Sequence, residues 1–565
     1  MSGIIGIDLG TTNSAASFIE DGEARIIPND RGSRLTPSVV AFTDTDELLV
    51  GEAAKNQAMI NSEGTVRSVK RRIGSDEVII VRGKSYSPQE LSSFILRKIK
   101  RDCESYLGKD IHEAVISVPA YFNEAQRRAT QEAGKLAGFR VRRIINEPTA
   151  AALAYASSVE GHKRVLVYDL GGGTFDVTVL KSDGKSFSVL ATSGDNMLGG
   201  DDFDRILFER VCEDFSRQSG IDISKDALLS QQLMDQVERA KIELSGRDTA
   251  LIALPFIGGD RKPVHLSYTL QREELNKMIR PLIERTIELS RRAVEDSGEE
   301  VDSLIFSGGS SRIPLVHTLM KQNFKVNPEG KSNPDEVVAL GAAVQSSLLQ
   351  EEGRGAAAMV TFKDVTPLPL GVEIEGGNFQ SVVDRNSPIP AEGTQVFTTV
   401  ADSQRTVEVH VLQGVGNRAT ENTSLGRFLL TGIREAKRGV PQIEVRFQVD
   451  EDGLLKVSAK DLDTGASQNV TISRDAGESD KSLSDHSIRL KLDTLIQRAR
   501  GLMQNVASEI DRSFREEIEE ILDRSGKASA QQERSEMLEC KVALETIIGE
   551  LLSLQQEQEV GFGRA

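Results

Sequence analysis

The sequence predicts a multidomain protein that begins with an α/β domain, continues with an antiparallel β domain and ends with a short α-helical segment. The chain has 565 residues, which is more than a single hydrophobic core usually serves. Up to residue 350, short apolar runs alternate with amphipathic stretches, as in α/β domains. Closely spaced strand-like runs follow after residue 367, and helical spacing begins at about residue 484.

The α/β domain is expected over residues 1–350. Short apolar runs that end near Gly, Pro or Asp are typical of buried strands in a sheet covered by helices. The predicted strands of this kind are Ile4–Ile7, Val115–Val118, Val165–Tyr168 and Leu304–Phe306. The amphipathic stretches Pro88–Tyr106 and Glu273–Asp296 are predicted helices.

An internal repeat marks two strand ends of this domain. Gly6–Thr12 and Val167–Thr174 each hold an apolar strand, then Asp-Leu-Gly, then small residues. Phosphate oxygens need backbone N–H donors at close range, and Gly, Ser and Thr let the backbone approach closely. Asp8 and Asp169 could face a shared Mg²⁺, which usually takes one or two carboxylates and several waters. The repeat favours a duplicated fold that closes on one ligand, although one such turn alone would suit an ordinary strand end.

Two further segments fit the same ligand. The pair Gly308-Gly309 follows a predicted strand, and a flat base could lie over its backbone. The stretch 237–245 is predicted to be helical, which places three polar side chains on one face: Glu238, Lys241 and Ser245. Taken alone, this stretch would be read as a solvated charged helix.

The second half of the chain changes pattern. A small, polar stretch at Gly353–Ala358 predicts an interdomain linker over residues 351–366. The β domain is expected over residues 367–478, with strands at Val382–Val383, Gln395–Val400, Thr406–Gln413, Gln442–Val449 and Leu454–Ala459. Residues 479–565 are predicted to be helical, with one helix that ends at Gly526 and another at Glu533–Leu554.

Composition narrows the function. The net charge of −17 argues against nucleic acid as a partner, because phosphate binding along a strand needs clustered Lys and Arg. The chain shows neither a basic N-terminal segment with an apolar run nor an apolar stretch of about 18 residues, so we expect a cytoplasmic protein without a membrane partner. The cysteines Cys103, Cys212 and Cys540 are far apart, which predicts free thiols in a reducing compartment.

Six segments together resemble the DnaK-type heat shock protein 70 chaperone family, in order and at similar spacing. They read IGIDLGTTNS, VISVPAYFNEAQRRAT, RIINEPTAAALAYA, VLVYDLGGGTFDV, ERAKIELS and FSGGSSRIP. The resemblance runs from residue 3 to about 350 and resumes through the β domain to about 475. It implies an actin-like α/β ATPase domain, an antiparallel β-sandwich that binds peptides, and a short α-helical lid.

The resemblance also implies roles for individual residues in ATP hydrolysis. Lys70 would stabilise the transition state beside the γ-phosphate, and Glu147 would orient the attacking water. Glu147 begins a Glu-Pro-Thr run that would equally suit a plain helix start. The implied catalytic residues are Lys70, Glu147, Asp169, Thr174 and Asp176. Nucleotide contacts are implied for Gly10, Thr11, Thr12, Asn13, Gly171, Gly172, Gly173, Thr174, Glu238, Lys241, Ser245, Gly308, Gly309, Ser310, Arg312 and Asp335.

Ligands and partners follow from the same resemblance. ATP or ADP would bind with Mg²⁺ held through water by Asp8 and Asp169, and K⁺ is left open. Pro119 and Arg127 resemble the pair that relays nucleotide state, and Arg143 resembles a contact for a J-domain cochaperone. The peptide groove would be formed by Val372, Ile374, Glu375, Phe397, Val400, Val407 and Val409, with Val407 at the pocket floor. Clients would be unfolded or extended polypeptides, a nucleotide exchange factor is left open, and the protein is expected to be a monomer with functions in protein folding and the stress response.

Three departures from the family pattern stand out. The linker reads Met359-Val360-Thr361-Phe362-Lys363, which is less apolar than the acidic-then-leucine linker of familiar members. Glu375 and Val400 occupy the positions of an arch that is usually Met opposite Ala. The helical lid is short. These features resemble the HscC branch of specialised bacterial members.

Two other functions stay open at this point. A sugar kinase or filament-forming ATPase would share the two-lobed domain but would carry no β domain after residue 367. The second is a regulatory ATPase of narrow specificity that sequesters one client, with weak coupling between its domains; the intact Lys70, Glu147 and Asp169 argue against a form that does not hydrolyse ATP. The altered linker and arch leave this second alternative open.

Overall fold

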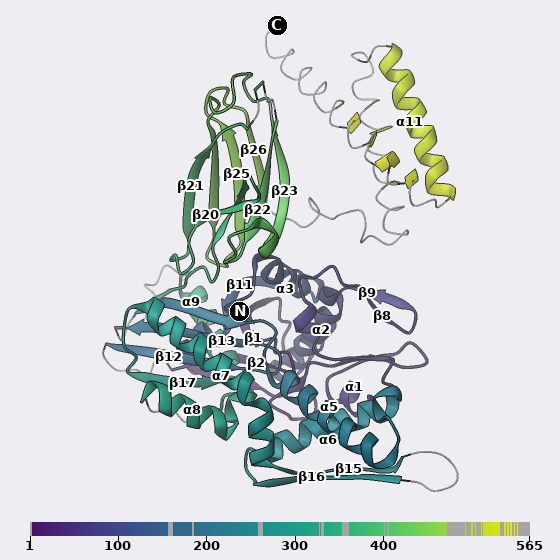
Figure 1. The fold of residues 1–565 in the computed structure, drawn as a ribbon, viewed down its shortest axis with the longest axis vertical. Helices are drawn as coiled ribbons and strands as arrows, with labels where there is room; N and C mark the ends of the chain where they lie inside the picture. Colours follow the sequence, from purple (N-terminus) through teal and green to yellow (C-terminus); the bar gives the residue numbers. More distant parts are fainter. Residues whose placement is uncertain are drawn as a thin grey trace. The chain divides into compact units, whose positions relative to one another are not determined.

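The computed structural model describes residues 3–471 apart from 156–161, 184–185, 258–263, 327, 329–332, 353–360, 401 and 404–405. In the C-terminal part it describes residues 512–531 and scattered positions between 492 and 551. The chain divides into two compact units, Met1–Ser473 and Arg474–Ala565. The prediction of a chain that mixes helices with several sheets is confirmed (Figure 1).

The first lobe is built on a 6-stranded sheet in the order β11-β10-β1-β2-β3, with β4 paired to β2. Strands β1, β10 and β11 run parallel, whereas β2 and β3 are antiparallel to their neighbours. The strands are β1 (Ile4–Asp8), β2 (Asn13–Glu20), β3 (Glu23–Ile27), β4 (Thr36–Pro37), β10 (Glu113–Val118) and β11 (Arg140–Asn146). Helices α2 (Pro88–Leu107) and α3 (Glu124–Leu136) pack on the sheet and share its core.

Local sequence explains where these helices begin. The Ser87 hydroxyl accepts a hydrogen bond from the Glu90 backbone N–H, and the Glu90 carboxylate accepts one from the Ser87 backbone N–H. Pro88 occupies the first turn of α2. The helix ends at Gly108, whose φ of 64° is the left-handed conformation that glycine adopts readily. The predicted helix Pro88–Tyr106 is therefore found within one residue of its predicted end.

The second lobe holds a 5-stranded sheet in the order β17-β12-β13-β14-β18. The strands are β12 (Lys163–Leu170), β13 (Phe175–Ser182), β14 (Ser186–Asp195), β17 (Ser303–Ser307) and β18 (Thr361–Lys363). Helix α7 (Arg272–Ser297) packs against β13 and β14. The remaining helices are α5 (Gly200–Ser219), α6 (Ala227–Glu243) and α8 (Pro314–Phe324), which share one large core with the sheet.

Two helices join the lobes at their base. Helices α4 (Glu147–Ala154) and α9 (Val337–Glu352) pack on each other, and α9 also packs on β1. Glycines permit this closeness, because a Cβ on Gly341 would lie 1.7 Å from the Ala150 carbonyl oxygen and one on Gly6 would lie 2.3 Å from the Ala343 nitrogen. The two halves of the repeat therefore share a rigid base.

Short elements complete the two lobes. In the first lobe these are β5 (Val40–Phe42), β6 (Leu48–Val50), α1 (Glu52–Gln57), β7 (Thr65–Val66), the 3-10 turn η1 (Val69–Arg72), β8 (Ile79–Val81) and β9 (Lys84–Tyr86). In the second lobe they are η2 (Ile223–Lys225), β15 (Thr249–Ile257), β16 (Val264–Gln271) and η3 (Gly309–Arg312).

The β domain consists of two antiparallel sheets, in the orders β20-β19-β22-β23 and β21-β24-β25-β26. Their strands are β19 (Leu370–Ile374), β20 (Asn378–Val383), β21 (Ala391–Phe397), β22 (Thr406–Gln413), β23 (Thr423–Thr431), β24 (Ile443–Val449), β25 (Leu455–Asp461) and β26 (Ser467–Thr471), with a 3-10 turn η4 at Ala419–Glu421. Both sheets contribute to one buried core, so they pack face to face (Figure 1).

Two predictions for this half need correction. The strand expected over Gln395–Val400 ends at Phe397 in β21. Helix α11 runs from Arg512 to Gln531 and so passes through Gly526, which was predicted to end it. Its apolar side chains Ile518, Leu522 and Ala528 are buried in one core, and this packing outweighs the modest helix cost of a glycine. Most of residues 484–511 and of Glu533–Leu554 lie outside the described residues.

Within the described part of the chain, none of the helices is both long and apolar enough to cross a bilayer.

Candidate functional site

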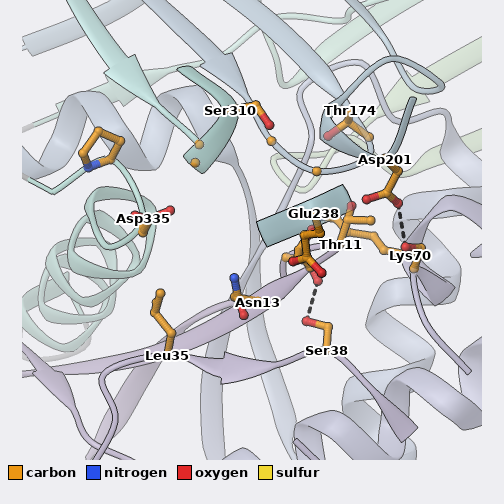
Figure 2. Close-up of a pocket in the computed structure, with 18 of the residues that line it drawn as sticks. Thr11, Asn13, Leu35, Ser38, Lys70, Thr174, Asp201, Glu238, Ser310 and Asp335 are labelled. Atoms are coloured by element: carbon orange, nitrogen blue, oxygen red, sulfur yellow. Dashed lines mark hydrogen bonds between the residues drawn. The ribbon is translucent and has the colours of Figure 1, made fainter. Parts of the chain in front are cut away.

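A cavity of about 550 Å³ lies between the two lobes (Figure 2). Its lining comes from the ends of β1, β12 and β17, from the turn η1 and from helix α6. The sequence-predicted residues that line it are Asp8, Gly10, Thr11, Thr12, Asn13, Lys70, Glu147, Asp169, Gly171, Gly172, Thr174, Glu238, Lys241, Ser245, Gly308, Gly309, Ser310, Arg312 and Asp335. Segments that are far apart in the sequence are thus brought to one site.

The two halves of the repeat face each other across the cavity. A Cβ built on Gly172 would lie 2.0 Å from Thr12 Oγ1, and one on Gly173 would lie 2.7 Å from Thr11 Cγ2. Only glycine fits so close to the opposite turn. The backbone of both turns is therefore available at the wall of the cavity, where it can donate to phosphate oxygens.

Lys70 and Glu147 form a buried ion pair at the deep end of the cavity. Lys70 is 4% exposed and Glu147 is 7% exposed, and the Lys70 ammonium donates to Glu147 Oε1. Burial opposes the charged form of Lys70, but the carboxylates of Glu147, Asp8 and Asp169 outweigh this effect and raise its pKa. The lysine is therefore charged and can face an anionic group.

Two buried aspartates, Asp169 and Asp176, and the partly buried Asp8 surround this pair. Burial and the nearby Glu147 raise the pKa of Asp8 to about 7, and the same two causes raise the pKa of Asp176 to about 7. Burial also raises the pKa of Asp169, although Ser307 Oγ donates to it at 2.9 Å. A cation would favour the ionised forms of these groups.

The donor set fits Mg²⁺. No group of three or more metal-ligating side chains occurs among the described residues. Magnesium usually keeps several waters and takes one or two carboxylates together with substrate phosphates. Asp8 and Asp169 supply such carboxylates beside the two turns, so bound Mg²⁺ would neutralise charge on a phosphate held there.

The other end of the cavity is lined by α6 and η3. Lys241 Nζ donates to Asp204 Oδ2 at 2.6 Å and to the Gly200 carbonyl at 3.0 Å. Burial raises the pKa of Asp204 to about 6, and the ammonium of Lys241 opposes that rise. Arg312 pairs with Asp335 at 2.8 Å near the Gly308-Gly309 backbone. The predicted helix 237–245 therefore contributes to the wall of the cavity and is not only a solvated face.

Two of the residues predicted for catalysis or nucleotide binding, Gly173 and Asp176, do not line the cavity. Asp176 lies next to Asp169 in the pairing of β12 with β13, and one of its oxygens accepts from the Tyr121 backbone at 2.8 Å. Gly173 presents its carbonyl to Arg71 Nε at 3.1 Å. Both support the cavity wall from behind.

Several lining residues were missed by the sequence reading. They are Leu35, Ser38, Val39, Lys55, Arg67, Ser68, Asp201, Asp204, Met234, Ile242, Ser307, Ile313, Pro334 and Val338. A signal existed for Asp201, because Gly199-Gly200 precedes it in a further glycine turn before a helix. The apolar residues carry no such signal, since they resemble ordinary core.

One of the two predicted relay residues, Arg127, contacts the β domain. Arg127 is buried, and its guanidinium donates to the Ala120 carbonyl at 3.0 Å, to Asn146 Oδ1 at 2.6 Å and to the Asp452 carbonyl at 3.5 Å. Pro119 accepts a hydrogen bond from the Phe122 backbone at 3.1 Å in the same turn. Arg127 therefore touches the turn between β24 and β25.

Arg143 reaches the same turn. It forms ion pairs with Glu451 and, at 3.3 Å, with Asp452. The Ile144 backbone N–H also donates to Asp452 Oδ1 at 3.0 Å. In this arrangement the Arg143 side chain is bound by two acidic residues of the same chain.

Part of the linker adds a strand to the second lobe. Strand β18 pairs in parallel with β14, and the rings of Phe362 and Phe187 are stacked with centroids 6.5 Å apart. The following Asp364 accepts hydrogen bonds at 2.8 Å from both Asn146 and Thr149. Met359 and Val360 lie outside the described residues.

The predicted groove residues differ widely in exposure. Val372 and Val409 are buried in the core shared by both sheets, at 3% and 4% exposure. Ile374, Phe397 and Val407 are partly buried at the margin of that core. Val400 is 53% exposed and Glu375 is exposed, so these two side chains are on the surface.

Comparison with known families places the whole chain. The family model described as Hsp70 protein matches residues 4–560, which is nearly the full length. Whether the chain falls in the HscC branch stays a prediction. The matched residues include both glycine turns, the buried Lys70–Glu147 pair and the β domain. This chain therefore belongs to the Hsp70 family of ATP-binding chaperones.

Proposed function

We propose that this protein hydrolyses ATP and uses the energy to capture and release extended peptide segments in its β domain. The observation that carries the proposal is the cavity of about 550 Å³ into which Lys70, Glu147 and both Asp-Leu-Gly turns converge. Such a cavity can hold a nucleotide with its phosphates against backbone N–H donors.

The chain's own groups would carry the hydrolytic step. Lys70 is positioned to stabilise negative charge on the transferred phosphoryl group, and Glu147 to hold the attacking water. Thr174 and Asp176 would support this arrangement, and Mg²⁺ held through water by Asp8 and Asp169 would neutralise phosphate charge. The charged state of Lys70 in its buried surroundings supports its role.

Coupling to the β domain would pass through β18 and the β24–β25 turn. Strand β18 is anchored by backbone pairing that does not depend on apolar side chains, so Thr361 and Lys363 do not prevent it. Arg127 touches both the Asn146 side chain, next to Glu147, and the Asp452 carbonyl. A change at the cavity that moves Asn146 would therefore reach the β domain.

The β domain would take the client. An extended peptide can pair with strand edges while one side chain enters an apolar pocket. Ile374, Phe397 and Val407 are partly buried and apolar, which suits the margin of such a pocket. A J-domain cochaperone is expected to compete with Glu451 and Asp452 for Arg143.

The test is to time dissociation of labelled unfolded peptides from the full chain with and without ATP and Mg²⁺, beside Lys70→Ala. Much faster release with ATP supports the proposal, and Lys70→Ala is expected to bind ATP but lose hydrolysis by about 100-fold or more. Unchanged release with hydrolysis intact would favour the alternative, a regulatory ATPase that sequesters a client with weak coupling. Absence of hydrolysis in the wild type would contradict both.

A further inference from the structure

The turn that carries Lys70 is fastened to the opposite lobe by side chains. Ser68 Oγ donates to Asp201 Oδ2 at 2.6 Å. Arg71 donates to Asp202 Oδ2 at 2.5 Å and to the Gly173 carbonyl at 3.1 Å. Ser68 and Arg71 belong to the turn at η1 in the first lobe, whereas Asp201 and Asp202 begin α5 in the second.

These contacts lie on the phosphate side of the cavity. Ser68 and Asp201 both line it, and Figure 2 shows Asp201 beside the turn that carries Lys70. The Gly172 carbonyl, which belongs to a phosphate-facing turn, accepts from the Asp201 backbone at 2.7 Å. Separation of the lobes at this side must therefore break the Ser68–Asp201 hydrogen bond.

The backbone of Ser68 is arranged to make this contact. Its φ of 53° and ψ of 32° are left-handed, a conformation that residues other than glycine adopt infrequently. A residue keeps such an unfavourable backbone conformation only where its contacts stabilise it, as the hydrogen bond to Asp201 does for Ser68. The Asp201 carboxylate is partly buried, and because burial raises its pKa, the Ser68 hydroxyl and Arg71 offset part of the cost of its charge.

Contacts on the base side are ion pairs between long side chains. Lys55 pairs with Glu238 at 3.3 Å through a lysine side chain that is 38% exposed, so solvent screens this interaction, and Arg67 pairs with Asp235 at 2.9 Å. On the phosphate side, the short Ser68 hydroxyl makes a single, directed hydrogen bond to a charged acceptor, which is stronger than a neutral hydrogen bond.

We propose that the Ser68–Asp201 hydrogen bond is a latch that retains bound nucleotide by holding the two lobes together beside the phosphates. This inference rests on the proposed function, because it concerns how the same cavity keeps ADP. Ser68 and Asp201 act as positioning residues, and Arg71 with Asp202 forms the second half of the same contact.

The test measures nucleotide release by the full chain, with a fluorescent ADP analogue and Mg²⁺ in a stopped-flow instrument. Ser68→Gly removes the hydroxyl but accepts the left-handed backbone. We expect it to release the analogue about tenfold faster, equivalent to about 1.4 kcal/mol, with little change in association rate. Ser68→Asn is expected to restore slow release, because Asn tolerates this conformation and its amide can donate to Asp201.

A second variant and a matched control sharpen the result. Asp201→Ala should accelerate release to a similar extent, and the Ser68→Gly/Asp201→Ala double variant should be no faster than either one. The control is Asp46→Gly, because Asp46 also has a left-handed φ of 63° but lies exposed in the first lobe, outside the cavity lining.

The outcomes separate the two proposals. A wild type that fails to bind the analogue would overturn the proposed function and this latch with it. Normal binding by the wild type together with wild-type release from Ser68→Gly would overturn the latch alone. So would additive effects in the double variant, or equal acceleration by Asp46→Gly.

Discussion

At the scale of single residues, the most consequential feature is the buried pair of Lys70 and Glu147. The motifs around both residues were recognisable in the sequence, so their convergence could be anticipated. The Ser68–Asp201 contact could not, because its partners lie 133 positions apart and, although a glycine turn precedes Asp201, nothing in the sequence marks Ser68 as its partner. Contacts of this kind arise only when the lobes close on each other, and no local pattern encodes them.

The Lys70–Glu147 pair predicts a stability effect that is separate from catalysis. Lys70→Ala should lower the free energy of unfolding of the nucleotide-free protein by about 3 kcal/mol, because it leaves the buried Glu147 carboxyl group without its partner. Adding Glu147→Gln should recover most of the loss. Thermal unfolding of the single and double variants measures this, and equal stability of Lys70→Ala and the wild type would contradict it.

Glu375 predicts a charge preference among clients. Its exposed carboxylate follows β19, next to partly buried apolar side chains that we assign to the groove. The wild type should bind basic peptides in preference to acidic ones, and Glu375→Met should reduce that preference by about two- to fivefold, the size of an exposed charge interaction. A peptide array tests this.

The matched control for the array is Glu392→Met. Glu392 is an exposed acid of β21 in the same domain and pairs with Arg446 at 2.6 Å. If Glu375→Met leaves the preference for basic peptides unchanged, or if Glu392→Met reduces it equally, Glu375 does not lie beside the peptide groove.

At the scale of elements, the predicted bounds agree with the structure where a regular hydrophobic pattern extends over many residues or where the end residues strongly favour a helix start or stop. Strand β22 is found at the bounds predicted for it, and α2 differs by a residue at one end. Strands β23 and β26 were missed, because their polar and apolar residues do not stand out from the neighbouring turns. Helix propensity alone predicts a helix end at Gly526, whereas the buried face of α11 stabilises a helix that continues through this residue.

Gly526 offers a direct test of that correction. A Cβ built at this position would meet nothing within 4 Å, and the residue lies inside α11. Gly526→Ala should therefore stabilise the C-terminal helical unit by about 0.5–1 kcal/mol, through helix propensity. The control is Gly108→Ala, where a φ of 64° makes any side chain strained and destabilisation is expected. Loss of helical circular dichroism in Gly526→Ala would show that the helix does end there.

At the scale of the whole molecule, the sequence carries local signals for changes of pattern along the chain, but it carries no signal for contacts between distant segments. The repeat, the change of pattern after residue 367 and the helical spacing near the end are all local signals. The contacts of Arg127, Arg143 and Asp364 with distant segments are not, because they depend on how the β domain packs on the first lobe. An altered linker sequence suggested weak coupling, yet β18 pairs with β14 through backbone groups that any residue except proline supplies.

The linker strand therefore provides the sharpest test of coupling. Phe362→Ala removes the ring that stacks on Phe187 while it leaves the backbone able to pair. An aromatic pair contributes about 0.5–1.5 kcal/mol beyond its buried area, so ATP-stimulated peptide release should slow by about two- to tenfold. Lys363→Ala, at an exposed position of the same strand, should leave release unchanged. If ATP-stimulated peptide release slows equally in both variants, the strand tolerates no side-chain change at all. If ATP stimulates peptide release from Phe362→Ala as fully as from the wild type, coupling passes through the Arg127 and Arg143 contacts instead.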